Sequence, residues 1–296
     1  MAVRAGEELK DLARFPSHVS KFSRLADEVP ARSLTVVAIG GGTVGDFAGF
    51  LASVYKRGVR LVHVPSTWLS AIDSSHGGKT ALNTSGAKNQ LGSFHLADEV
   101  FLVRSLLESQ PSERARDAMA ELAKIALIDG SAWTKKFATS RLEGSSLIWK
   151  FLKPAIEAKM KIVARDPRER TGLRQVLNLG HTLGHVIEAE LGWSHGRSIA
   201  QGLFFALELG ESMAIMSERD FEKAASLLAH LGLNPERPPR PMKASRVRSL
   251  LAKDKKRQAR GSVTFVFLKR PGRAVRREVP IETLVKEATR IGWVAR

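Results

Sequence analysis

The sequence contains no cysteine, which excludes disulfide bonds, thiolate nucleophiles and cysteine-ligated zinc or iron–sulfur centres. Any metal must therefore be held by histidine, aspartate or glutamate. No apolar run approaches the roughly 18 residues of a bilayer-spanning helix. The first residues, MAVRAGEELKDLARF, have no uninterrupted apolar core of the signal-peptide type. We therefore expect a cytoplasmic protein without membrane association.

Acidic residues are few relative to basic ones. The chain has 47 Lys and Arg against 30 Asp and Glu, a formal net charge of +17, which suits nucleic acid, phosphorylated metabolites or a membrane surface. Basic residues cluster at 253–261 and 269–277, but no helix-turn-helix, zinc-finger or RNA-recognition pattern accompanies them. Charge alone cannot choose among these partners, but we do not expect nucleic acid.

The pattern of apolar residues changes near residue 110. Before it, LTVVAI (34–39), a glycine turn and FAGFLASVYKRG predict strand, turn and helix, and VRLVHVP (59–65) predicts a second buried strand. After Pro111 helical periodicity dominates up to a predicted hairpin within GSVTFVFLKRPGRAVRREVP and a closing helix. The 296 residues allow two domains. We predict an α/β domain at 1–110 and a mainly α-helical domain at 111–296.

A glycine-rich turn follows the first predicted strand. Gly40, Gly42 and Gly45 fit G-x-G-x-x-G between a strand and a helix, where glycines let the backbone approach a pyrophosphate. The acidic residue that holds the ribose about 20 positions further on in the standard dinucleotide fold is absent. A tight turn without a ligand is the alternative.

A polar stretch, DSSHGGKTALNTSGAKN (73–89), concentrates lysines, amides and hydroxyls between glycines. Such a stretch suits a phosphorylated polyol, and a solvated loop is the alternative. The side chains concerned are those of Asp73, Ser74, Ser75, Lys79, Thr80, Asn83, Lys88 and Asn89.

The helical half carries two further candidates. Glu121 and Lys124 lie on one helix face, either as a surface ion pair or as a buried carboxylate with its cation. His181 and His185 also share a face, and His195 follows. Thr182 replaces the glutamate of the zinc-protease motif. The histidines are either metal ligands or ordinary packed side chains.

Taken together, these segments resemble the 3-dehydroquinate synthase family, the NAD- and metal-dependent sugar-phosphate cyclases. The resemblance rests on GGGTVGDFAGFLASVYKRGVRLVHVPST, DSSHGGKTALN, GAKN, MAELAK, GLRQVLNLGHTLGHVIE and HGR, which occur in the family's order. It implies a Rossmann-like NAD-binding α/β domain, an α-helical metal-binding domain and a homodimer.

The resemblance also assigns roles to residues. Zinc or cobalt is expected on Glu121, His181 and His195, with His185 contacting substrate or relaying protons. The other expected substrate-site residues are Arg57, Lys79, Asn89, Lys124, Lys159, Arg174 and Asn178. Those expected to face NAD are Glu7, Lys10, Gly40, Gly41, Gly42, Asp46, Ser66, Thr67, Asp73, Ser74, Lys88 and Ser109.

The implied activity is a carbon–oxygen lyase reaction of the shikimate pathway, in which 3-deoxy-D-arabino-heptulosonate 7-phosphate becomes 3-dehydroquinate and phosphate. A cyclase of the inosose or valiolone type and a catalytically inactive homologue are the alternatives. The sequence departs from the family pattern at Ser66, Ala87 and Arg197. It also starts after the family's first βαβ unit, so we expect a truncated NAD domain and weakened NAD binding.

Overall fold

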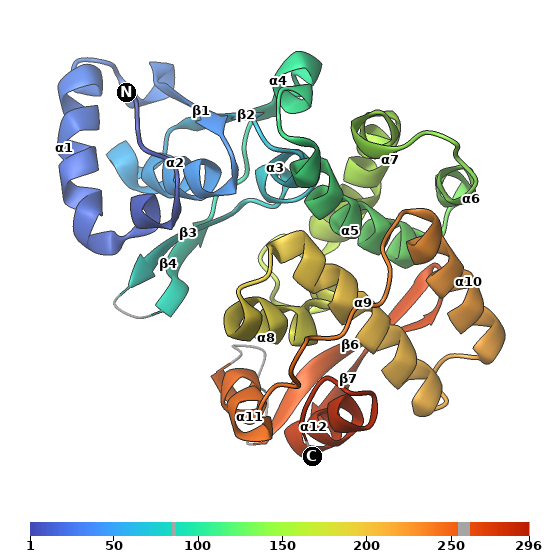
Figure 1. Ribbon diagram of the computed structural model, residues 1–296. Coiled ribbons are helices and arrows are strands. Elements are labelled where there is room, and N and C mark those ends of the chain that lie inside the picture. The colour runs from blue at the N-terminus through green and yellow to red at the C-terminus, as the bar shows by residue number, and fades with distance from the viewer. Residues whose placement is uncertain (85–86, 254–260, 296) are drawn as a thin grey trace. The chain divides into compact units, whose positions relative to one another are not determined.

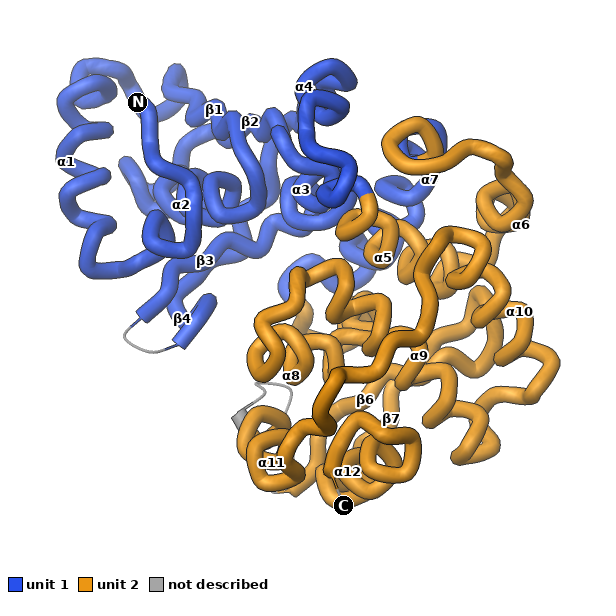
Figure 2. The backbone as a smooth tube through the Cα atoms, in the orientation of Figure 1, with its two compact units in different colours: residues 1–115, 148–168 blue, residues 116–147, 169–296 orange. Residues whose placement is uncertain are grey.

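The computed structural model describes residues 1–84, 87–253 and 261–295 (Figure 1). They form two compact units (Figure 2): unit 1 comprises 1–115 and 148–168, and unit 2 comprises 116–147 and 169–296. The expected domain boundary at residue 110 stays a prediction. Two sequence features fall partly outside the described residues, the basic cluster at 253–261 and the polar stretch at 73–89.

A small parallel sheet forms the centre of unit 1. Strands β1 (Thr35–Gly40), β2 (Arg60–Pro65) and β5 (Glu99–Val100) lie in the order β1-β2-β5. Helix α2 (Gly42–Val54) packs on the sheet through Ala48 and Ala52, which cluster with the buried Val36, Ala38 and Leu61. The predicted strand, turn and helix are confirmed, although the helix already begins within the glycine run.

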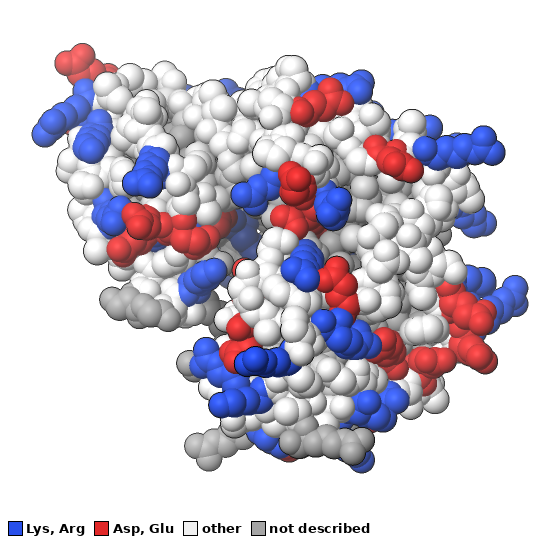
Figure 3. Space-filling view, viewed as in Figure 1, with Lys and Arg blue, Asp and Glu red and all other residues white. Residues whose placement is uncertain are grey.

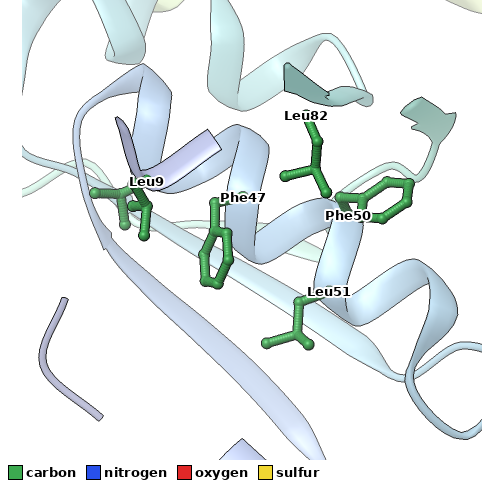
Figure 4. Packing of buried hydrophobic residues seen from close by; sticks show 6 residues of the cluster. Leu9, Phe47, Phe50, Leu51 and Leu82 are labelled. Atoms are coloured by element: carbon green, nitrogen blue, oxygen red, sulfur yellow. The ribbon is translucent and has the colours of Figure 1, made fainter. Parts of the chain in front are cut away.

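Part of the polar stretch belongs to an antiparallel ribbon rather than to an irregular loop, and most residues of its second strand are exposed. Strand β3 (Lys79–Thr84) pairs with β4 (Ala87–Phe94). Leu82 of β3 is fully buried and joins Leu9, Phe47, Phe50 and Leu51 in a second apolar cluster (Figure 4). A single buried leucine among polar residues therefore anchors the ribbon on α2, which the local sequence does not reveal.

Short helices complete unit 1. They are η1 (Glu7–Lys10), η2 (Leu12–Arg14), α1 (Phe15–Ala26), η3 (Ala31–Ser33), η4 (Tyr55–Arg57), α3 (Trp68–Ile72), η5 (Ser74–His76) and α4 (Arg104–Glu108). Residues 148–165 of the long helix α7 (Gly144–Arg165) also belong to this unit.

The described residues of unit 2 form helices and an antiparallel hairpin. Strand β6 (Ser262–Arg270) pairs with β7 (Arg273–Pro280), and the closing helix α12 (Ile281–Arg290) follows, as predicted. Phe265 and Phe267 of β6 are buried in this core. The other helices are α5 (Ser112–Asp129), α6 (Ala132–Ala138), η6 (Leu173–Asn178), α8 (His181–Leu191), α9 (His195–Ser212), α10 (Glu218–His230) and α11 (Ala244–Lys253).

The segment LRQVLNLGHTLGHVIEAEL does not form the one continuous helix that its periodicity predicts. It divides into η6 and α8, because Gly180 has a φ of +79° and interrupts the helix just before His181. Consequently His181 occupies the first position of α8. Within the described residues, none of the helices is both long and apolar enough to cross a membrane.

Candidate functional site

Three potential metal ligands converge in unit 2. Glu121 lies within α5, His181 begins α8 and His195 begins α9. One donor atom from each residue lies within 4.8 Å of the other two. The Nε2 atoms of His181 and His195 are each 3.4 Å from Oε1 of Glu121. The structure thus brings together all three residues that the family resemblance suggested as ligands.

Close backbone packing creates this convergence. A Cβ at Gly196, next to His195, would lie 2.0 Å from the Asp117 carbonyl oxygen of α5, one turn before Glu121. A Cβ at Gly202 would lie 1.8 Å from the carbonyl oxygen of Gly180. Real Cβ atoms do not approach other atoms this closely, so only glycine lets α9 pack against α5 and α8 at these distances.

The Glu121 carboxylate is fully buried and has a nearby cation. Its Oε2 forms an ion pair with Nζ of Lys124, whose side chain is only 3% exposed. The structure therefore supports the buried alternative for this pair. A buried carboxylate is costly unless positive charge compensates it. Lys124 compensates one oxygen, and the two histidines face the other.

Both histidine rings are oriented from their Nδ1 side. Nδ1 of His181 lies 3.2 Å from the carbonyl oxygen of Leu179, and Nδ1 of His195 lies 3.0 Å from Oε2 of Glu188. Each acceptor favours a proton on Nδ1 and leaves the lone pair on Nε2. Once Nε2 carries no proton, its lone pair points towards Glu121, as in histidine-ligated metal centres.

The pKa of His195 also shows that the neighbouring carboxylates favour positive charge at this site. Burial lowers the pKa of His195, but hydrogen bonds and charge interactions with Glu121 and Glu188 outweigh this effect and raise the pKa to about 10. A divalent cation would satisfy the same carboxylates without the Nε2 proton. The two nitrogens and one oxygen fit a zinc-type ion with a further position for substrate or water.

The remaining candidates of unit 2 lie close by in the chain. His185 is one turn along α8 from His181, and their ring centroids are 5.2 Å apart. It lies outside the group of three donors. Arg174 is buried on η6, and Asn178 is half-buried as the last residue of that helix.

In unit 1, the carboxyl ends of β1 and β2 bring several candidates together. Gly40 is in register with Pro65, and the Ser66 amide donates to the Gly40 carbonyl oxygen at 2.9 Å. A Cβ at Gly41 would lie 3.1 Å from the Thr67 methyl group, and one at Gly42 would lie 3.3 Å from Oγ of Ser74. Ligands of parallel α/β sheets bind at this edge.

A second polar group in unit 1 surrounds the ammonium of Lys10. This lysine is buried, donates to Oδ1 of Asn89 and pairs with Asp46 at 2.5 Å. Burial raises the pKa of Asp46, and the attraction of Lys10 partly offsets that effect. Nearby along the chain, Asn83 donates to Glu7 at 2.9 Å. Residues 79 positions apart therefore meet here.

A third group joins Lys159 of α7 to the end of α3. The buried Nζ of Lys159 donates to the backbone oxygen of Asp73 and to its carboxylate at 2.6 Å. His76 follows on η5, where burial lowers its pKa to about 4.

Four further candidates are exposed: Arg57, Lys79, Lys88 and Ser109. The Ser109 hydroxyl donates to the Leu106 carbonyl oxygen at 2.7 Å and so supports the end of α4.

The residues that support the histidines were not among the candidates predicted from the sequence. Glu188 contacts His195, and Ser194 donates to the carboxylate of Asp117. Glu188 lies two turns after His181 on the same helix, so the sequence could have placed both residues on one helix face. Its contact with His195, however, depends on the turn between α8 and α9.

The charged surface shows no continuous basic stripe on the face drawn in Figure 3, where Lys and Arg are interspersed with Asp and Glu. The expectation that nucleic acid is not a partner stays a prediction.

Comparison with known families and structures matches both halves of the chain. Residues 1–117 match the family model "3-dehydroquinate synthase N-terminal", and residues 118–257 match "3-dehydroquinate synthase C-terminal". A 2-deoxy-scyllo-inosose synthase solved with carbaglucose-6-phosphate, NAD+ and Co2+ is 28% identical, with a TM-score of 0.84 over 99% of this chain and 82% of that chain.

More distant structures share the fold. A 2-epi-5-epi-valiolone synthase from Streptomyces hygroscopicus subsp. jinggangensis 5008, solved with NAD+ and Zn2+, is 21% identical, with a TM-score of 0.78 over 98% of this chain and 81% of that chain. A sulfoacetaldehyde reductase from Bifidobacterium kashiwanohense, solved with NAD+, is 12% identical, with a TM-score of 0.56 over 97% and 81% of the two chains.

Proposed function

Since this chain belongs to the 3-dehydroquinate synthase family of sugar-phosphate cyclases, we propose that it converts 3-deoxy-D-arabino-heptulosonate 7-phosphate to 3-dehydroquinate and phosphate. The arrangement of Glu121, His181 and His195 carries the metal-dependent part of this proposal, because a buried carboxylate and two oriented imidazoles suit a divalent ion. In the proposal the helical domain holds the metal and the α/β domain holds NAD.

The two bound groups would supply hydride transfer, from NAD, and polarisation of the hydroxyl that is oxidised, from zinc or cobalt. The glycine turn at 40–42 presents backbone amides suited to the pyrophosphate of NAD. Asp46, Ser66, Thr67, Asp73 and Ser74 are the side chains proposed to contact it. Of these, Thr67 already caps α3, since its Oγ1 accepts from the Ser70 amide at 3.2 Å.

The anionic substrate requires cationic side chains. Arg174 is proposed to bind the carboxylate or phosphate, because its guanidinium can form two parallel hydrogen bonds with either group. Lys124 is proposed to stabilise negative charge that develops beside Glu121, with which it is paired. His185 is proposed to move a proton, because it neighbours His181 without belonging to the donor group.

Inosose synthesis is the second candidate, favoured by the 28% identity to the 2-deoxy-scyllo-inosose synthase. That enzyme was solved with an analogue of glucose 6-phosphate, a sugar without a carboxylate. The two reactions therefore place different demands on Arg174.

A direct assay compares the candidates. The purified chain is incubated with NAD, Co2+ or Zn2+ and one sugar phosphate, and phosphate release and the carbocyclic product are followed by NMR. We expect turnover of the seven-carbon keto-acid phosphate, loss with a chelator and recovery when metal is restored. Turnover of glucose 6-phosphate alone would establish the second candidate instead.

If neither sugar phosphate releases phosphate although the chain binds NAD and metal, the proposed reaction is wrong. An inactive homologue that binds nucleic acid would instead show binding that weakens steeply with salt.

A further inference from the structure

His195 differs from His181 in the group that accepts a hydrogen bond from its Nδ1 atom. The acceptor for His181 is the backbone carbonyl of Leu179, whereas the acceptor for His195 is the carboxylate of Glu188, 3.0 Å from Nδ1. A backbone carbonyl therefore orients His181, whereas the side chain of Glu188 orients His195. The two carboxylates that flank His195 also differ: Glu121 is fully buried, and Glu188 is 32% exposed.

The carboxylate of Glu188 selects one tautomer of His195. An ionised carboxylate can only accept, so it keeps a proton on Nδ1, and Nε2 is the nitrogen that offers a lone pair when an ion displaces its proton. Nε2 is the atom that lies 3.4 Å from Oε1 of Glu121. With the opposite tautomer, an N–H group would point to the position of the ion and the ring could not act as a ligand there.

Local structure places Glu188 for this contact. Glu188 lies near the end of α8, and the chain needs only residues 192–194 to turn back into α9, which begins at His195. Ser194 holds this turn, because its hydroxyl donates to Asp117 of α5 and accepts from the Arg197 amide at 3.4 Å. The ring of His195 therefore enters between Glu188 and Glu121.

We propose that Glu188 is a positioning residue that fixes the tautomer and orientation of His195 for metal binding. The inference rests on the proposed function, because it assumes that Glu121, His181 and His195 bind a divalent ion. A carboxylate that accepts a hydrogen bond from a metal-ligating histidine also raises the basicity of the ring nitrogen that binds the metal. Loss of such a carboxylate typically lowers metal affinity about 10- to 100-fold.

The test measures metal affinity rather than turnover. Co2+ and Zn2+ affinities are determined by competition with a chelator for the wild-type chain, Glu188→Ala and Glu188→Gln. The matched control is Glu190→Gln on the same helix, which removes a surface ion pair with Arg246 at 2.8 Å. Circular dichroism establishes that each variant is folded.

We expect Glu188→Ala to lose about 10- to 100-fold in affinity and Glu190→Gln to stay within about twofold. Glu188→Gln should lose less than the alanine variant, because its amide oxygen can still accept from Nδ1. In the Zn2+-loaded wild type, the Nδ1 proton of His195 should give a slowly exchanging NMR signal, which the alanine variant lacks.

The outcomes separate the two proposals. If the wild-type chain binds the ions but Glu188→Ala binds them within about threefold of wild type, the role of Glu188 is refuted and the metal site stands. An equal loss in Glu190→Gln would also refute it. If the wild-type chain binds neither ion, the metal assignment fails together with this inference.

Discussion

The contact between α8 and α9 allows a quantitative prediction for Gly202→Ala. The added Cβ would lie 1.8 Å from the Gly180 carbonyl oxygen, whereas ordinary contacts begin at 3.4 Å. The difference, 3.4 minus 1.8, requires the two backbones to separate by about 1.6 Å. Metal ligands tolerate deviations of only about 0.2 Å. Since Gly180 directly precedes His181, the spacing between His181 and His195 should change by more than a metal centre tolerates.

We therefore expect Gly202→Ala to lower Co2+ affinity roughly 100-fold, the upper end of the effect of losing an outer-sphere partner. The free energy of unfolding should also fall, because the added Cβ would meet a backbone oxygen rather than a flexible side chain. Overpacking costs about 1–3 kcal/mol, and the replacement of a helical glycine by alanine returns up to about 1 kcal/mol.

The assay combines Co2+ titration with thermal unfolding, and α9 offers its own control. At Gly210, a Cβ would have no neighbour closer than 3.7 Å, so Gly210→Ala should bind Co2+ as the wild type does and unfold at the same or a higher temperature. Wild-type affinity in Gly202→Ala would refute the reasoning. So would an equal loss in Gly210→Ala, because the close contact would then not be the cause.

Three further predictions follow from individual side chains. His181→Ala should abolish metal binding and activity while His185→Ala retains the metal, and equal metal content in wild type and His181→Ala would contradict the ligand assignment. Arg174→Ala should weaken substrate binding or turnover by about 2–4 kcal/mol, so steady-state kinetics equal to wild type would exclude contact with the anion. His63 is buried in β2, and burial, followed by repulsion from His95, lowers its pKa to about 4. The folded state then binds fewer protons than the unfolded state, so the stability that His63 contributes above pH 6.5 should fall by roughly 3 kcal/mol as the pH drops to 4. Denaturant unfolding of wild type and His63→Gln above pH 6.5 and at pH 4 measures the contribution of His63 to this loss. If the two proteins lose equal stability between these pH values, the prediction is wrong.

The sequence alone determined the elements whose signals are local. The β-branched run before Gly40 predicted β1, the glycines after it predicted the turn into α2, and the alternation within 262–280 predicted the C-terminal hairpin. These patterns are readable because the periodicity of apolar residues and the conformational freedom of glycine act within a few residues. The family resemblance also implied that Glu121, His181 and His195 are ligands, although it did not show how close together they lie.

Tertiary structure decided the contacts that join distant segments. Burial of Leu82 packs the ribbon on α2. The side chain of Lys159 donates a hydrogen bond to Asp73, which lies 86 positions away in the sequence. Periodicity carried no sign that Gly180 would end one helix and place His181 at the start of the next. The contact of Glu188 with His195 likewise depends on the turn between α8 and α9, which Ser194 links to Asp117 of α5. Such contacts depend on how whole helices pack, and packing is set by side-chain volumes along several elements at once rather than by any one segment.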